Sequence, residues 1–238
     1  MRTGQASRAT AGLAALVLTL TGCAAGAPAT VGPDAAAAAF YGEEPLQPTL
    51  RPSFVLTDTD GQAYDFAAQT SGRPTLLYFG YTSCPDECPT AMADLAAALR
   101  STPQALREQT RVVFVTTDPD RDSPPLVRRF LDQFSTEFVG LVGTQAEVDA
   151  AQLSMGVTPA AKGPDVPTLP GRPDAHEHRS GTPAHEHVGP LGYGVGHADV
   201  IFAFNVDDRL PVLYRGGVVR PSDLASDLVL LAAPGDPQ

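Results

Sequence analysis

The chain has 238 residues, of which 43% are hydrophobic, enough for one domain of ordinary size with a core and tails. Its 27 acidic residues outnumber the 16 basic ones, and the formal net charge of −11 argues against a nucleic-acid partner. The 23 prolines and 22 glycines indicate long irregular segments beside the folded part.

Residues 1–22 have the pattern of an export signal. Arg2 and Arg8 form a basic start, and the apolar run that follows has secretory length but is too short for an ordinary spanning helix. The run ends in Leu-Thr-Gly-Cys, which resembles a bacterial lipobox whose cysteine is acylated and becomes the new N-terminus. We therefore predict lipidation at Cys23 and a location on the extracytoplasmic face of the cell membrane. The alternative is a plain signal peptide that happens to contain a cysteine.

Residues 23–49 are rich in Ala, Pro and Gly and have no periodic apolar face, so we expect a flexible spacer between the lipid and a folded domain. The domain is predicted to span residues 50–232, with residues 233–238 as a C-terminal tail. It opens at residues 53–66, where apolar and polar residues alternate around Asp60-Gly61, a pattern typical of a tight hairpin.

Strands and helices then alternate. Unbroken apolar runs predict covered strands, and apolar positions at helical spacing behind a capping residue or proline predict helices. The strands are expected within residues 73–82, 111–118 and 138–143, and the helices within 88–101, 123–134 and 144–156. Thr144 and Glu147 have the spacing of a capping box at the start of the last of these helices.

The periodic pattern stops at residues 158–196, which are rich in proline and glycine, so we expect a long irregular insert. Order returns with two strands around Asp207-Asp208 and a helix within residues 220–233. This order predicts an α/β domain with a partly parallel sheet. It matches a thioredoxin-like fold with an added N-terminal β-hairpin and the insert before the last hairpin.

Cys84 and Cys88 are the two cysteines left to the domain once Cys23 is assigned to the lipid. A disulfide between cysteines this close would close a very short loop and stabilise the fold little. We therefore expect the pair to have a chemical role and not a structural one. Cys84 follows a central strand and Cys88 begins a helix, a position where functional groups collect and where helix N–H groups favour a thiolate. The three intervening residues can still allow a disulfide, and they also leave room for a metal ion between the sulfurs.

Two thiolates suit Cu(I), zinc or an iron–sulfur cluster. Zinc usually takes four ligands and a cluster takes four cysteines, whereas copper accepts fewer. One imidazole would complete a three-ligand copper site, and His197, just before the strand expected beside the cysteine-bearing one, is the candidate. The alternative is a surface histidine at a strand end.

Four stretches together resemble the Sco/SenC family: "YFGYTSCPDECPTAMADL", "VFVTTDPDRDSPPLVRRFLDQF", "FVGLVGTQAEV" and "YGVGHADVIFAFNVDDRL". The resemblance runs from about Leu50 to Leu231, broken by the insert. It implies a membrane-tethered, thioredoxin-like copper protein with Cys84, Cys88 and His197 as ligands. The sequence departs from the family at "GHAD", where relatives commonly have an Asp-His-Ser run.

The resemblance also implies a role in assembling cytochrome c oxidase. We expect a binding and transfer protein that delivers Cu(I) or Cu(II) to the binuclear copper site of oxidase subunit II. The alternative is an enzyme, a thiol–disulfide oxidoreductase that keeps the cysteines of that or another exported partner reduced. Other copper chaperones or thiol reductases are further expected partners, and nucleic acid is not.

Two further groups of residues are candidates. Asp118 follows a strand end and is expected beside the cysteine loop, either orienting a ligand or serving as ordinary turn chemistry. The insert carries two His-x-His copies, formed by His176, His178, His185 and His187. They form either a mobile secondary copper trap or a variable solvated loop in which the histidines are incidental.

Overall fold

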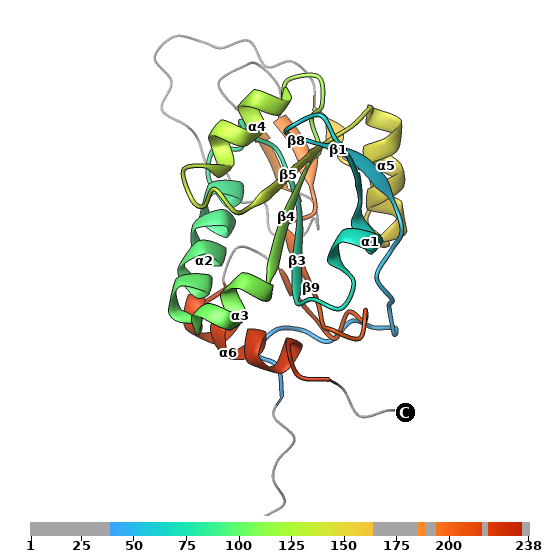
Figure 1. Ribbon diagram of the computed structural model, residues 1–238. Coiled ribbons are helices and arrows are strands. Elements are labelled where there is room, and N and C mark those ends of the chain that lie inside the picture. Colours follow the sequence, from blue (N-terminus) through green and yellow to red (C-terminus); the bar gives the residue numbers. More distant parts are fainter. Residues whose placement is uncertain (1–38, 164–184, 189–193, 216–218, 235–238) are drawn as a thin grey trace, which may run out of the picture. The chain divides into compact units, whose positions relative to one another are not determined.

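The computed structural model describes residues 39–163, 185–188, 194–215 and 219–234 (Figure 1). The predicted signal peptide, most of the predicted spacer and the last four residues of the tail lie outside these ranges. No helix in the described ranges is both long enough and apolar enough to cross a bilayer.

A seven-stranded sheet forms the centre of the fold, in the order β10-β9-β3-β4-β5-β1-β2. Strands β3, β4 and β5 are parallel, and the other neighbouring pairs are antiparallel. The strands are β1 (Val55–Asp58), β2 (Ala63–Asp65), β3 (Thr75–Gly80), β4 (Arg111–Thr116), β5 (Val139–Val142), β9 (Val200–Phe204) and β10 (Val212–Arg215). The predicted N-terminal hairpin is confirmed as β1 and β2, with Gly61 in the turn at a φ of +80°.

Helices cover both faces of the sheet, which explains the unbroken apolar run of β3, all six of whose residues are buried. Helices α2, α4 and α6 pack on one face, and α1 and α5 pack on the other (Figure 1). The helices are α1 (Phe66–Thr70), α2 (Glu87–Ser101), α3 (Gln104–Gln109), α4 (Pro124–Leu131), α5 (Gln145–Ser154) and α6 (Pro221–Leu231).

The helix starts follow the sequence signals. The capping box of α5 is present, with the Thr144 side chain accepting from the Glu147 N–H and the Glu147 carboxylate accepting from the Thr144 N–H. Ser123 is the N-cap of α4 and Pro124 its first residue, as predicted, although the Ser123 side chain makes no capping bond.

A second, three-stranded sheet occurs where the sequence predicted only irregular structure. Its order is β6-β8-β7, formed by β6 (Ala161–Lys162), β7 (His185–Val188) and β8 (Gly194–His197). These strands are two to four residues long and carry no alternating apolar pattern, so sequence periodicity does not reveal them.

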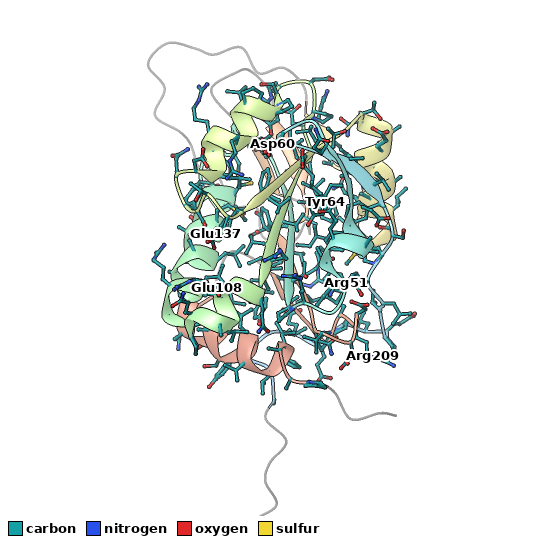
Figure 2. All side chains as sticks on the ribbon, in the orientation of Figure 1. Arg51, Asp60, Tyr64, Glu108, Glu137 and Arg209 are labelled. Carbon is teal, nitrogen blue, oxygen red and sulfur yellow. The ribbon has the colours of Figure 1, made fainter. Side chains whose placement is uncertain are left out.

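Arg51 lies in the segment before β1, at the opposite end of the sheet from the turn residue Asp60 (Figure 2). Its ion pair with Asp208 anchors this segment to the fold. Its guanidinium donates to the Asp208 carboxylate at 2.8 Å, to the Thr70 hydroxyl at 2.9 Å and to the Asn205 carbonyl at 3.1 Å. These bonds satisfy a side chain that is only 2% exposed.

Candidate metal centre

Cys84 and Cys88 lie on the short connection between β3 and α2. Cys84 precedes α2 by three residues, and Cys88 lies in the first turn of the helix. The Cys84 N–H donates to the Tyr81 carbonyl at 3.2 Å, and the Cys88 N–H donates to the Cys84 sulfur at 3.3 Å. These two bonds fold the connection back so that the Cys84 sulfur lies at the helix start, where N–H donors stabilise a negative charge.

The two thiols differ in exposure. Cys84 is 6% exposed and Cys88 is fully buried, and both are present as thiols. Burial, followed by the hydrogen bond and charge of Cys84, raises the pKa of Cys88. A metal ion that binds Cys88 must therefore displace a firmly held proton.

Gly80, the last residue of β3, makes the space for the Cys88 sulfur. A Cβ at this position would lie 2.8 Å from that sulfur and 2.7 Å from the Tyr78 ring. Because contacts this short do not occur in folded proteins, glycine is required for Cys88 to pack where it does. No local sequence pattern indicates this role, because it depends on the close approach of a strand and a helix.

Asp122 holds the cysteine loop to the end of β4. Its carboxylate accepts from the Thr82 N–H at 2.9 Å, from the Thr82 hydroxyl at 2.5 Å and from the Thr116 hydroxyl at 2.6 Å. The Thr117 N–H also donates to the Gly80 carbonyl at 2.7 Å. Burial raises the pKa of Asp122, and the bonds from Thr116 and Thr82 act in the opposite direction.

The predicted residue Asp118 lies in the connection between β4 and α4. It is fully buried and paired with Arg121, whose guanidinium lies 5.7 Å from the centre of the Tyr81 ring. Asp122, which the sequence did not single out, lies in the same loop and bonds directly to the cysteine loop. A strand end followed by Asp-Pro-Asp-Arg-Asp signals that a carboxylate acts here, but not which one.

The segment around His197 is bonded to the cysteine site on both sides. Two residues before His197, Val195 is fully buried in the cluster that contains both cysteines, and its backbone hydrogen-bonds with Tyr81. Two residues after it, the Asp199 carboxylate accepts from the Tyr78 hydroxyl at 2.9 Å. The same hydroxyl lies 3.8 Å from the Cys88 sulfur.

Tyr78 is therefore the link between the two parts of the site. Burial, with the charges of Cys88 and Asp199, raises the pKa of Tyr78, which keeps its hydroxyl neutral and able to donate. The sequence prediction that the strand after His197 lies beside the cysteine-bearing one is confirmed, because β9 pairs with β3.

The remaining candidate residues are described only in part. Among the described side chains, no three of His, Cys, Asp and Glu are grouped to hold a metal ion. The backbones of His185, His187 and His197 are described but their side chains are not, and Cys23, His176 and His178 lie outside the described residues. The three-ligand copper site therefore stays a prediction.

These features define a class of protein. The fold is thioredoxin-like, with a dithiol between the end of a central parallel strand and the start of a helix. Two adjacent sulfurs at that place can bind a soft metal ion or exchange with a disulfide.

The chain belongs to the SCO1/SenC family, whose sequence model matches residues 42–180. A protein of Stutzerimonas stutzeri named for copper binding is 33% identical over 147 residues, which is 61% of this chain and 67% of that protein. Several other relatives match over less than half of their own length. The predicted family and fold class are thus confirmed.

Solved structures agree with this assignment. The copper-bound structure of Bradyrhizobium japonicum ScoI is 28% identical with a TM-score of 0.59, and the match covers 77% of this chain and all of that one. The fold of BsSco is also similar, with a TM-score of 0.51 at 19% identity over 80% of this chain and 96% of that one. BsSco is described as having a disulfide switch and as a member of the Sco family of cytochrome c oxidase assembly proteins.

Proposed function

We propose that this protein is a membrane-tethered copper chaperone that delivers copper to the binuclear site of cytochrome c oxidase subunit II. Cys84, Cys88 and His197 are the proposed ligands. One observation carries the proposal: the residues two before and two after His197 are bonded to the tyrosines that pack against the two cysteines.

The chemistry of the donors supports copper as the cargo. Two thiolates are soft ligands that prefer Cu(I), and one imidazole suits either oxidation state. Cys84 lies at the more accessible edge of the site, so copper can pass to a partner through it while Cys88 stays buried. Two observations on relatives support the same proposal: ScoI binds copper, and the Sco family is described as cytochrome c oxidase assembly proteins.

A titration with a competing Cu(I) chelator tests the proposal on the full chain in detergent. We expect one tightly bound copper in the wild type, loss of tight binding in Cys84→Ser and Cys88→Ser, and weakened binding in His197→Ala. Cys23→Ser is the matched control, because it removes the cysteine assigned to the lipid and should bind copper normally. Tight binding that survives both domain cysteine variants would refute the proposal.

Delivery is tested by mixing the copper-loaded chain with the copper-free soluble domain of subunit II. The chaperone proposal predicts that copper moves to subunit II and that the recovered chain is copper-free. Copper that stays on the chain at equilibrium would argue against delivery.

The unequal environments of the cysteines favour one second candidate, a thiol–disulfide oxidoreductase. Cys84 is the more exposed residue and its sulfur accepts an N–H bond, whereas Cys88 is enclosed, as in an attacking and a resolving thiol. Oxidation of the two thiols to a disulfide would supply two electrons and two protons, which reduce one partner disulfide to two thiols. If this is the function, His197→Ala still reduces a subunit II disulfide at the wild-type rate.

A further inference from the structure

The strand that carries the second His-x-His copy pairs with the strand that ends at His197. Strand β7 runs antiparallel to β8, with His185 directly opposite His197 and His187 directly opposite Val195. Directly opposite residues of an antiparallel pair occupy the same face, with Cα atoms about 4.5–5.5 Å apart. One histidine of the insert is thus a cross-strand neighbour of the proposed histidine ligand.

Val195 identifies which face this is. Alternate residues of a strand share a face, so His197 is on the face of Val195. The Val195 side chain is fully buried in the cluster that contains Cys84 and Cys88. The register therefore assigns positions 185, 187 and 197 to the face of the small sheet that is directed at the cysteine site, and of the two β7 histidines His185 is the one directly opposite His197.

The small sheet is also fixed to the loops of that site. Lys162 in β6, which pairs with β8, forms an ion pair with Asp120, in the loop where Asp122 holds the cysteine connection. The Tyr81 bond to the Val195 backbone also fixes β8. These contacts are independent of the β7–β8 pairing and hold β8, and so its partner β7, beside the dithiol.

We propose that His185 is a fourth ligand, which binds the copper ion when it is Cu(II). This inference rests on the proposed copper function. Two sulfurs and one imidazole suffice for Cu(I), whereas Cu(II) favours a tetragonal site with a further nitrogen or oxygen donor. His185 is the imidazole that the register brings next to His197. The insert thus contributes to the main copper site and does not only form a separate trap.

Electron paramagnetic resonance of the full chain with one equivalent of Cu(II) tests this, because coupling to imidazole nitrogen counts the bound histidines. We expect two bound imidazoles in the wild type and one in His185→Ala. The Cu(II) dissociation constant of the variant should be at least about tenfold higher than that of the wild type, which is the scale of losing a supporting partner at a metal site. His187→Ala is the matched control. It removes a histidine from the same strand and motif, but one opposite Val195, and should keep both imidazoles.

A wild type with one bound imidazole, or a His185→Ala variant that keeps two, would overturn the proposal. His185→Asn, which preserves size and polarity, should behave as the alanine variant, and circular dichroism checks that both are folded. Cys84→Ser distinguishes failure of the His185 ligand from failure of the copper site itself. If its Cu(II) spectrum equals that of the wild type, the Cys84 sulfur is not a ligand and the proposed copper site itself fails.

Discussion

The position of the Cys88 sulfur depends on a glycine and a tyrosine hydroxyl as well as on charged groups. This sulfur lies against Gly80 and within 3.8 Å of the Tyr78 hydroxyl, which in turn binds Asp199. A residue with no side chain and a neutral hydroxyl thus determine where a buried thiol lies.

Replacing Gly80 by alanine should damage the metal site. The added methyl group cannot fit 2.8 Å from the Cys88 sulfur, so the strand or helix must shift, at a cost of about 1–3 kcal/mol. We expect copper affinity to fall at least about tenfold, as when a metal ligand loses its support. Gly140→Ala is the control, because its Cβ would be equally crowded by Val127 and Leu131, away from the cysteines. The control should lose stability in urea and keep its copper affinity; equal affinity in both variants would contradict this account.

Asp208 gives the fold a defined pH dependence. Burial would raise the pKa of Asp208, but the bonds from Ser71, Arg51 and the Gly72 N–H together lower it. A lowered pKa in the folded state means that the carboxylate stabilises the protein above its unfolded pKa of about 3.9, and that this contribution is lost as the pH falls through the folded pKa.

Asp208→Asn tests this sign without a change of backbone. Asp208 has a φ of 59°, a conformation that asparagine also tolerates. We expect the variant to lose about 1–2 kcal/mol of unfolding free energy at neutral pH, because Arg51 loses its charged partner. Urea unfolding should show the wild type and the variant converging as the pH falls below the unfolded pKa of about 3.9 and through the lower folded pKa. A difference that grows as the pH falls would refute the assignment.

At the scale of elements, the site depends on two connections that are joined to each other. The loop from β3 to α2 carries the cysteines, and the loop from β4 to α4 carries Asp122, which binds the Thr82 backbone and side chain. The carboxyl ends of neighbouring parallel strands bring these loops together.

Asp122→Asn should weaken this connection. Asparagine replaces one accepting oxygen by an NH₂ group, which faces donors and leaves buried groups without acceptors, at a cost of about 1–3 kcal/mol. We also expect copper affinity to fall by about 10- to 100-fold, as when an outer partner of a metal ligand is removed. The control is Asp60→Asn, in the exposed turn between β1 and β2, which should change stability by less than about 0.5 kcal/mol. Unchanged copper binding in Asp122→Asn would show that the loop needs no such support.

The elements that the sequence predicted are those whose pattern is local. The central strands are continuous apolar runs, and α4 and α5 begin at a proline or a capping box. Helix α3 was not predicted because none of its residues is buried, so it carries no apolar period. Strands β6 to β8 were not predicted because they are short and lack an apolar period, and because β6 pairs with a segment far along the chain.

The same distinction holds within the site. The positions of Cys84 and Cys88 follow from a strand end and a helix start, which the sequence reveals. The roles of Gly80, Tyr78 and Asp122 depend on which loops and helices meet, and a single sequence does not encode that in a readable pattern.

At the scale of the whole molecule, the proposed function requires that the protein be anchored to a membrane. Because the chain carries a net negative charge of −11, the spacer would hold the domain away from anionic lipid. The anchor is proposed at Cys23, ahead of a spacer rich in Ala and Pro. Each buried acyl CH₂ contributes about 0.8 kcal/mol, so several chains attached at one cysteine hold a protein firmly.

Cys23→Ser should release the protein from the membrane. We expect the wild type in the membrane fraction, labelled by a fatty-acid analogue, and the variant unlabelled and displaced from that fraction. Cys84→Ser is the control and should remain membrane-bound and labelled. A labelled, membrane-bound Cys23→Ser protein would show that the attachment lies elsewhere.

X-ray absorption at the copper edge of the Cu(I)-loaded full chain tests the ligand set most directly, because it reports which atoms surround the ion. Two sulfur neighbours and one imidazole nitrogen are predicted in the wild type, one sulfur fewer in either Cys84→Ser or Cys88→Ser, and no imidazole in His197→Ala. A copper environment made of oxygen and nitrogen alone, or one unaltered by the cysteine variants, would contradict the account.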